Sequence, residues 1–280
     1  MNRPTESSLL TDAGQAPTSM PDVQGHRDLR NLPIDRVGVR RLRHPVLLRA
    51  GQGKKPIPSV ATFSLAVALP ADQKGTHMSR FVALLETMSR DGIELSADTA
   101  QSLARDMLKL LEAQEGTLQL EAPYFIEKAA PVSGVKSLMD YTVGFEATAG
   151  GDSPDTVLMV RVPVKSLCPC SKEISDYGAH NQRSEVTVRV RLGPQPAKLC
   201  VASLIRTVEA QASCELWGLL KRPDEKYVTE RAYDNAKFVE DLVRDVAISV
   251  RALPGVIGFE VEAENFESIH NHSAWARIAV

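Results

Sequence analysis

The sequence lacks any run of apolar residues that approaches the roughly 18 needed to cross a membrane. It also lacks an excess of either charge, because 33 Lys and Arg residues stand against 35 Asp and Glu residues and leave a formal net charge of −2. Broad binding to nucleic acid or to a membrane surface favours a basic excess. We therefore expect no nucleic-acid partner and no membrane partner.

Secretion and disulfide signals are missing as well. The N-terminus reads MNRPTESSLLTDAGQ and has neither the apolar core nor the cleavage site of a signal peptide. Four cysteines occur, Cys168, Cys170, Cys200 and Cys214, too few and too unevenly spaced for a disulfide framework. These features predict a cytoplasmic protein with reduced thiols. Cys200 and Cys214 lie in or beside an apolar helical pattern, which favours a packing role for both.

The common nucleotide-binding motifs are also absent, since neither GxxxxGK[ST] nor GxGxxG occurs. A phosphorylated ligand would have to be held in another way. What remains is an ordinary globular composition, with 43% hydrophobic and 24% charged residues. A length of 280 residues favours about two domains.

Composition divides the chain into four segments. Residues 1–20 show no periodicity and are predicted to form a disordered tail, and residues 21–58 are predicted to form an extended arm on the body of the protein. Within the arm, RVGVRRLRHPV alternates weakly and could form an edge strand, and its arginines are interpreted as a solvated face. Sharper patterns follow in a first module over residues 59–150 and a second over residues 151–280.

Period-two alternation predicts strands, and apolar residues three or four apart predict helices. In the first module the predicted strands cover residues 60–69, 117–130 and 137–149, and the predicted helices cover 76–90 and 96–116, with Ser96 as the cap and Gly116 as the stop. In the second module the predicted strands cover residues 155–167, 184–192, 255–266 and 272–280, and the predicted helices cover 200–219 and 235–253. This repeated order predicts an α+β fold of two tandem modules, each an antiparallel sheet with helices on one face.

The segment most informative about chemistry lies between two predicted strands and contains Cys168, Cys170 and His180. Thiol and imidazole groups are soft and borderline metal ligands. One interpretation is a metal site that uses Cys168 or Cys170 with His180 and leaves a position open for water. The other is a pair of buried thiols and a surface histidine.

Three further clusters of polar residues stand out. His270 and His272 lie two apart, on one side of an extended segment, and could be ligands, an acid–base pair, phosphate contacts or part of a polar turn. The charged residues 221–230, taken alone, predict a solvated loop.

The third cluster lies at a strand-to-helix junction and comprises Lys74, His77, Ser79 and Arg80. Backbone N–H groups at a helix start, together with cations, favour a phosphate ligand. The alternative is an ordinary helix cap followed by a helix face.

Taken together, five stretches resemble the type IB GTP cyclohydrolases of bacterial folate synthesis: VATFSLAVALP, GTHMSRF, SLCPCSKEISDYGAHNQRS, LLKRPDEKYVTERAYDNAKFVEDLVRD and ENFESIHNHSAWA. The resemblance covers residues 20–280. It implies the tunnelling fold, with two modules per chain and a homotetramer whose sites lie at subunit interfaces. The implied reaction converts GTP and water to 7,8-dihydroneopterin triphosphate and formate, the first step toward tetrahydrofolate.

The resemblance also implies a metal site. Cys168, His180 and Glu225 match its ligand positions, and the divalent metal would be zinc, manganese or iron(II). The bound water, its pKa lowered by the metal, would attack carbon 8 of guanine, so Cys168 is also counted as catalytic. The role of Cys170 stays open.

Other family positions supply proton transfer and substrate binding. His270 and His272 match positions near the site and would deliver protons as the imidazole ring opens. Glu240 matches the purine anchor, whose carboxylate accepts from N1–H and the 2-amino group and so rejects adenine. For the triphosphate the candidates are Lys74, His77, Ser79 and Arg80, with Lys165, Lys172 and Arg183 behind them.

Two other functions are weighed against the cyclohydrolase. The first is a nitrile reductase on the same fold, which would use a cysteine nucleophile and a nicotinamide cofactor. The second is a non-catalytic metal-binding protein built on the same Cys/His segment. A metal-binding protein would have no need of a purine anchor at Glu240.

Overall fold

The computed structural model describes residues 22–50, 55–151, 155–193 and 199–280. The predicted tail over residues 1–20 and part of the turn at residues 150–155 lie outside these ranges. Within them the strands are β1 (Ile34–Leu48), β2 (Ile57–Leu69), β3 (Glu94–Leu95), β4 (Glu115–Ala129), β5 (Lys136–Gly150), β6 (Asp155–Leu167), β7 (Asn181–Leu192), β8 (Val256–Asn265) and β9 (Ala274–Ala279). The helices are α1 (Met78–Arg90), α2 (Ala97–Leu111), α3 (Pro169–Ile174), α4 (Val201–Glu209), α5 (Arg222–Asp234) and α6 (Val239–Arg251).

All the described strands belong to one sheet, with the order β3-β1-β2-β4-β5-β6-β7-β8-β9. Every neighbouring pair is antiparallel except β1 and β3, which are parallel over two residue pairs. Apart from the short elements β3 and α3 and the helix α5, the first half runs β1-β2-α1-α2-β4-β5 and the second half runs β6-β7-α4-α6-β8-β9, so the same order occurs twice. The halves are joined where β5 pairs with β6, between Thr142↔Arg161 and Thr148↔Asp155.

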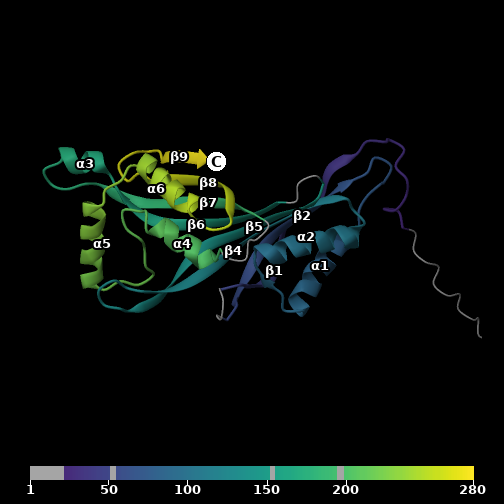
Figure 1. Cartoon of the computed structure of the whole chain (residues 1–280), viewed down its shortest axis with the longest axis horizontal. Coiled ribbons are helices and arrows are strands. Elements are labelled where there is room, and N and C mark those ends of the chain that lie inside the picture. The colour runs from purple at the N-terminus through teal and green to yellow at the C-terminus, as the bar shows by residue number, and fades with distance from the viewer. Residues whose placement is uncertain (1–21, 51–54, 152–154, 194–198) are drawn as a thin grey trace, which may run out of the picture.

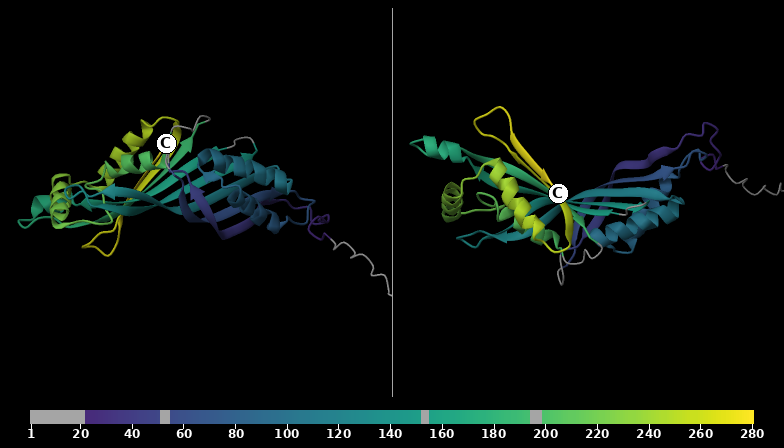
Figure 2. Two further views of the ribbon diagram at one scale, coloured as in Figure 1. Left: turned by 90° about the horizontal axis from the view of Figure 1, so that it is seen from below. Right: turned by 45° about the horizontal axis from the view of Figure 1, so that its top comes forward.

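Alternation along the strands gives the sheet one apolar face. On the central strands that face is formed by Leu65, Leu120, Val143, Val160 and Val188, each at most 2% exposed. Helices α1, α2, α4 and α6 contribute buried residues to the same core, which continues across both halves. The helices therefore cover one face of the sheet, as the sequence predicts (Figures 1 and 2).

Several boundaries differ from the prediction. The strand β1 runs along β2 within the segment predicted as an arm, although Pro33 and Pro45 bracket much of it. The helix expected over residues 200–219 is confined to α4, and that expected over 235–253 begins only at α6.

The second predicted helix begins at Ser96, as expected, but it does not end at Gly116. Ser96 accepts the backbone N–H of Thr99, and the helix stops at Glu112, which adopts the left-handed conformation at φ 54°. Gly116 instead lies in β4. A Cβ there would approach Met107 Cε to 2.8 Å and Ala66 O to 2.9 Å, so this glycine permits close approach of β4 to its neighbours.

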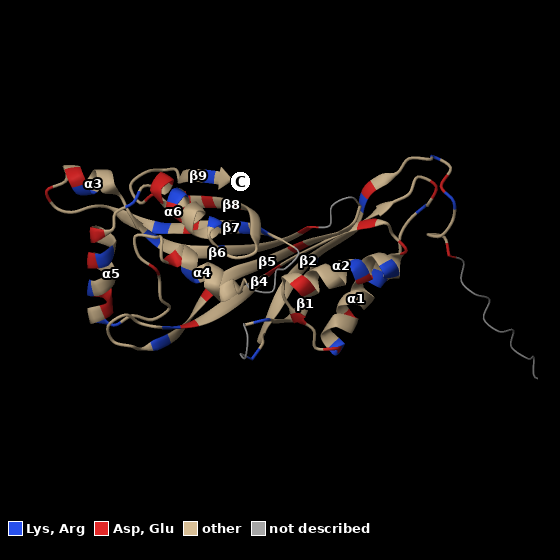
Figure 3. Ribbon diagram, in the orientation of Figure 1, with Lys and Arg blue, Asp and Glu red and all other residues tan. Residues whose placement is uncertain are grey.

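The prediction of a solvated loop over residues 221–230 is wrong, because these residues form most of α5. Lys and Arg alternate with Asp and Glu along this helix (Figure 3), so its apolar signal is weak. Its buried side chains, Asp224, Val228 and Ala232, recur every four residues on one stripe. Val228 and Ala232 pack with Leu167 and Cys214 in a small second core beside the end of β6.

Buried Cys214 confirms the packing role expected for it, and burial raises the pKa of its thiol. No helix in the described ranges is long and apolar enough to span a bilayer.

A buried charge network ties the β4–β5 hairpin to the end of α4 and to the segment that follows it. Lys128 Nζ lies 2.7 Å from Glu209 Oε1 and 2.7 Å from Glu215 Oε2, and 4.7 Å from the centre of the Trp217 ring. The Tyr141 hydroxyl donates to Glu209 Oε1 at 2.7 Å. Burial, with the nearby Glu209 carboxylate, raises the pKa of Tyr141 above its usual range, so this phenol remains a donor.

Removing the lysine should leave the two carboxylates of this network without their cation. We expect Lys128→Met to lower the free energy of unfolding by about 3–5 kcal/mol, the usual cost of breaking a buried ion pair. Lys136→Met, which removes the exposed pair of Lys136 with Glu127, should cost less than about 1 kcal/mol. Urea denaturation of both variants measures the difference, and equal losses would contradict a stabilising role for the buried network.

Candidate active site

The neighbouring strands β6 and β7 bring Cys168 and His180 together. Their ladder ends at the pair Leu167↔Asn181, and the next residue on each strand is Cys168 or His180. The backbone N–H of Cys168 donates to the His180 carbonyl at 3.2 Å, which extends the ladder by one step. Cross-strand neighbours hold their Cβ atoms about 4.5–5.5 Å apart. Cys168 and His180, which are 12 positions apart in sequence, are therefore cross-strand neighbours.

The loop between these two residues is itself ordered. The helix α3 begins directly after Cys168, with Pro169 in its first turn. Ser171 Oγ donates to the Cys168 carbonyl at 3.1 Å and accepts the His180 backbone N–H at 3.2 Å. Ser171 thereby links the two ends of the loop. Cys168 and His180 are partly buried, whereas Cys170 is exposed.

Hydrogen bonds fix the orientation of the His180 ring. Its Nδ1 lies 3.1 Å from Gln182 Oε1 and 3.9 Å from Glu267 Oε2. Gln182 Nε2 donates to Glu267 Oε1 at 3.2 Å, so the amide oxygen is the atom that faces the ring. Nδ1 is then the N–H donor, and Nε2 keeps its lone pair. A metal-binding histidine commonly has this arrangement, in which the second nitrogen is held by a carboxylate or an amide.

The donors suit a metal ion only in part. A thiol sulfur and an oriented imidazole are suitable ligands for zinc or iron(II). Within residues 22–50, 55–151, 155–193 and 199–280, however, no group of three His, Cys, Asp or Glu side chains is close enough to hold a metal ion. One chain therefore supplies a pair of donors here, and Glu225 does not join them.

Glu225 lies in the first turn of α5, where its side chain is exposed. The preceding residue, Asp224, is completely buried. Asp224 Oδ1 accepts the backbone N–H groups of Val132 and Ser133, each at 2.8 Å, and Oδ2 accepts the Ser133 hydroxyl at 2.6 Å and the Lys221 N–H at 2.8 Å. This one carboxylate joins the tip of the β4–β5 hairpin to the start of α5. It therefore fixes the position of the backbone at Glu225, the next residue.

A second contact joins α3 to the other end of α5. Lys172 Nζ donates to the Tyr233 carbonyl at 2.6 Å and lies 4.3 Å from the centre of the Tyr233 ring. The last carbonyls of a helix favour a cation. Lys172, a secondary candidate for the triphosphate, therefore has a partner within the fold that holds the Cys168 loop against α5.

The C-terminal histidines lie on the connection between β8 and β9. The rings of His270 and His272 are stacked, 5.1 Å between centroids and 7° from parallel, and both residues are exposed. The same connection carries Glu267, whose contact with Gln182 brings it to the His180 ring. Glu240 is exposed in the first turn of α6.

Two candidate cations lie on the same two strands as the Cys168–His180 pair. Lys165 and Arg183 are register partners on β6 and β7, three residues from Cys168 and from His180 respectively. Lys165 Nζ donates to Asn181 Oδ1 at 2.5 Å, and burial lowers the pKa of its ammonium group. Arg183 is exposed.

The other phosphate candidates lie far away within one chain. The segment with Lys74, His77, Ser79 and Arg80 leads into α1, toward the opposite end of the long axis from α3 and α5 (Figure 1). Arg80 already donates to the Leu110 carbonyl at 2.9 Å, at the end of α2. His77 Nε2 lies 3.5 Å from Asp22 Oδ2. A single chain therefore does not bring this cluster to Cys168.

Three residues of the site were not singled out from the sequence. Gln182 and Glu267 fall within the matching stretches around His180 and His270, where a polar side chain next to a candidate ligand is the available signal. Asp224 was hidden in a charged run, because nothing in the sequence distinguishes a buried aspartate from its exposed neighbours.

Asp224 should make the stability of the folded protein depend on pH. Burial opposes its ionisation, but the hydrogen bonds from Ser133, Lys221 and Val132 outweigh burial and hold the pKa of Asp224 well below its usual range. Its stabilising effect is complete above the ordinary aspartate pKa of about 3.9 and is lost as pH falls toward the lower pKa of the folded protein.

We expect Asp224→Asn to be markedly less stable than the parent protein at pH 7, and this difference to narrow as pH falls below about 4. Asp234→Asn, at the exposed end of the same helix, should match the parent at every pH. Thermal unfolding across pH measures both variants. A difference that stays constant from pH 7 to pH 3 would contradict an ionised, hydrogen-bonded Asp224.

Sequence comparison places the chain among known proteins. The family model described as "Type I GTP cyclohydrolase folE2" matches residues 20–276. The chain is 58% identical over 276 residues to GTP cyclohydrolase FolE2 of Bordetella petrii, covering 99% of this chain and 98% of that protein. It is 56% identical to the FolE2 of Polynucleobacter asymbioticus, covering 94% of this chain and 96% of that protein.

Solved structures agree on the fold at much lower identity. Uricase from Arthrobacter globiformis matches with a TM-score of 0.51 and 9% identity, over 88% of this chain and 92% of that one. A hyper-thermostable uricase variant matches with a TM-score of 0.53 and 8% identity, over 88% and 91%. These uricases have the tunnelling fold, which is therefore the fold of this chain. On its sequence, the chain belongs to the FolE2 family of type I GTP cyclohydrolases.

Proposed function

We propose that this protein is a GTP cyclohydrolase that converts GTP and water to 7,8-dihydroneopterin triphosphate and formate, the first step of folate biosynthesis. Identity of 56–58% to FolE2 proteins over nearly the full length supports the activity. One structural observation carries the chemistry: the Cys168–His180 pair at the end of β6 and β7, with His180 Nδ1 already engaged.

The pair is proposed to hold a divalent metal, zinc, manganese or iron(II), through Cys168 Sγ and His180 Nε2. Glu225, which does not join this pair within the single described chain, is proposed to reach it as the third ligand in the assembled protein, which keeps a position open as a catalytic site requires. When bound, such a metal supplies a water of lowered pKa as the nucleophile for carbon 8 of guanine. Gln182 and Glu267 keep His180 in the tautomer and orientation that present Nε2.

A homotetramer with shared sites is proposed to complete this arrangement. One chain keeps Lys74, His77, Ser79 and Arg80 apart from Cys168, so another copy would have to bring them there. The site-bearing end also exposes apolar side chains: Ile174 is 83% exposed, Tyr177 is fully exposed, and Ile269 is 63% exposed. Apolar groups gathered beside a candidate site favour burial against a partner.

Substrate recognition is proposed to follow from charge and hydrogen-bonding capacity. Glu240, exposed at the start of α6, would accept N1–H and the 2-amino group of guanine. Lys165 and Arg183, on the two strands that lead to the Cys168–His180 pair, would favour phosphate oxygens. His270 and His272 are exposed imidazoles, a type of side chain that suits proton delivery. The cytoplasm, where GTP is abundant, is the proposed location.

The alternative functions are less well supported. The relatives that match along nearly the whole chain are cyclohydrolases, which does not favour a nitrile reductase or a non-catalytic metal-binding protein.

The activity is tested by GTP turnover of metal-reconstituted protein, followed through pterin fluorescence after oxidation. We expect the parent protein to form pterin and Cys168→Ala to lose at least about a thousandfold in kcat, since the nucleophile depends on the metal. Cys200→Ala, at the start of α4, should retain full activity. Pterin formation by Cys168→Ala at the parent rate would reject Cys168 as a ligand, and no pterin with any of the three metals would reject the proposed reaction.

The support of His180 is tested separately by metal affinity. We expect Gln182→Leu and Glu267→Gln to weaken metal binding by about 10–100-fold, the usual effect of losing a group that orients a ligand. Gln119→Leu, an exposed position on β4, is the matched control and should bind the metal like the parent protein. Competition with a chromophoric chelator measures the affinities. Unchanged affinity in both site variants would contradict the orienting role.

A further inference from the structure

The face of the sheet opposite the helices carries a lattice of ion pairs. Arg189 Nη2 lies 2.6 Å from Glu146 Oε2, and Arg161 Nε lies 3.3 Å from Glu185 Oε1. Arg191 on β7 and Arg277 on β9 are paired in the same way, with Asp155 and Glu260. On β1, by contrast, Arg36 and Arg40 have no carboxylate within 4.0 Å among the residues that the structure describes. Both guanidinium groups of β1 are therefore without an ion-paired carboxylate in the described part of the chain.

The backbone of β1 places these two arginines around a gap. Arg36, Gly38 and Arg40 alternate with Val37 and Val39, so all three face away from the helices. A Cβ on Gly38 would lie 1.9 Å from the Leu65 carbonyl oxygen, so no side chain can stand between the arginines. A bulge follows directly after Val39, where Arg41 adopts a φ of 58°.

The gap is a hollow of about 190 Å³. Arg36 and Arg40 line it, together with the hydroxyl groups of Ser64 and Thr117 and the amide of Gln119. No carboxylate is among its lining residues. Every polar side chain that lines the hollow can therefore donate a hydrogen bond, and two of them carry a positive charge.

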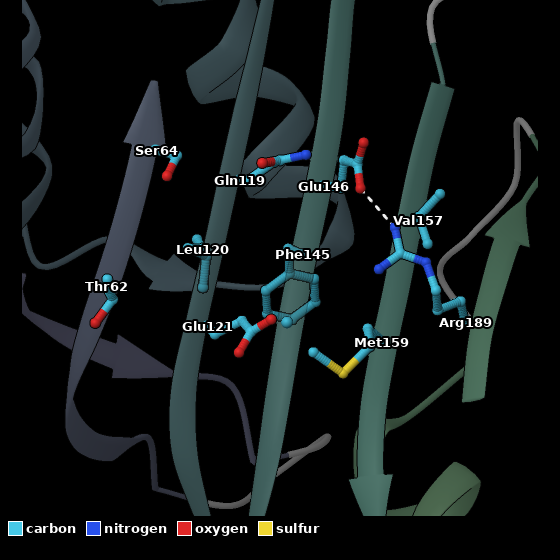
Figure 4. A pocket seen from close by; sticks show the side chains of 11 residues that line it. Thr62, Ser64, Gln119, Leu120, Glu121, Phe145, Glu146, Val157, Met159 and Arg189 are labelled. Atoms are coloured by element: carbon cyan, nitrogen blue, oxygen red, sulfur yellow. Dashed lines mark hydrogen bonds and ion pairs between the residues drawn. The ribbon is translucent and has the colours of Figure 1, made fainter. Parts of the chain in front are cut away.

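The hollow continues into a neighbouring one of about 300 Å³ on strands β2 and β4 to β7. Ser64 and Gln119 line both, and Figure 4 shows Gln119 beside Glu146 of the Glu146–Arg189 pair, with Ser64 on the next strand. The neighbouring hollow contains carboxylates, Glu121 and Glu146, and Arg36 also borders a smaller hollow that contains Asp35 and Glu115. Only the β1 hollow combines two arginines with a lining free of carboxylates among these three. An anionic group would bind between Arg36 and Arg40. The rest of the ligand could extend into the neighbouring hollow, over its uncharged side chains and the Glu146–Arg189 pair.

We propose that the β1 hollow is a second binding site, for a phosphate group carried by a small molecule. A planar guanidinium matches two oxygens of one phosphate, and two such groups with hydroxyl and amide donors suit its several oxygens. None of its lining residues belongs to the candidate active site, so the site is separate from the proposed catalysis. The run RVGVR, interpreted from the sequence as a solvated face, is here the framework of an anion site.

The test is titration of the full-length protein with inorganic pyrophosphate by isothermal calorimetry. The variants are Arg36→Gln/Arg40→Gln and, as a control for charge, Arg105→Gln on the helix-covered side of the sheet. The parent protein and both variants share the same catalytic site. A difference in pyrophosphate binding between them therefore reports on the β1 hollow. We expect the double variant to lose one binding event or weaken it at least about tenfold, while Arg105→Gln binds like the parent protein.

Two further readouts complete the test. Arg36→Lys/Arg40→Lys, which keeps the charge but not the planar fork, should bind with intermediate affinity. GTP turnover should be the same in every variant, which separates this site from the active site. Equal pyrophosphate binding in all variants would overturn the proposal, and so would an equal loss in Arg105→Gln. A change of oligomeric mass in the double variant without a change in binding would instead assign the arginines to a contact between copies.

Discussion

The register between β6 and β7 is the constraint on which the site depends. One hydrogen bond, from the Cys168 N–H to the His180 carbonyl, carries the ladder one residue beyond the end of both strands. A slip of one residue would move every side chain of β7 to the other face of the sheet and separate the thiol from the imidazole. The register is secured by burial, because Val186, Val188 and Val190 can reach the core only in this pairing. The same burial that stabilises the fold therefore assembles the pair of donors.

Around this pair, buried carboxylates link peripheral elements that share little apolar surface. Glu209 is bound by Lys128 near the end of β4, and Asp224 is bound by the turn that follows β4. Both contacts hold the β4–β5 hairpin against the chain that leads into and through α5. A buried charge is costly when unpaired, so each contact strongly favours one placement of α5. That placement fixes Glu225 and, through Lys172, the loop that follows Cys168.

The sheet and most helices follow from local pattern. The strands β2, β4, β5 and β6 alternate cleanly because one face of each is covered and the other is polar. The helix α5 could not be found in this way, since Val228 and Ala232 are its only buried apolar residues and its third buried side chain is charged. The stop at Glu112 was missed because Gly116 offered a stronger cap signal than a left-handed glutamate.

The parts of the candidate site that lie near one another in the sequence were easier to predict than the parts that long-range strand pairing brings together. Cys168 and His180 flank adjacent strands, so the chain order alone brings them close. Gln182 and Glu267 are 85 residues apart and meet only because β7 pairs with β8. The cluster from Lys74 to Arg80 lies at the other end of the molecule from Cys168 (Figure 1), and nothing in the local pattern of the sequence indicates this separation.

The most direct measurement is X-ray absorption at the metal edge of protein reconstituted with zinc or iron(II). If Cys168 and His180 hold the metal, the spectrum will contain one sulfur ligand, at about 2.3 Å for zinc, with the remaining ligands nitrogen or oxygen. Cys168→Ala will lose the sulfur, and Cys170→Ala will retain it. A spectrum without sulfur in the parent protein, or with sulfur retained in Cys168→Ala, would contradict the proposed centre.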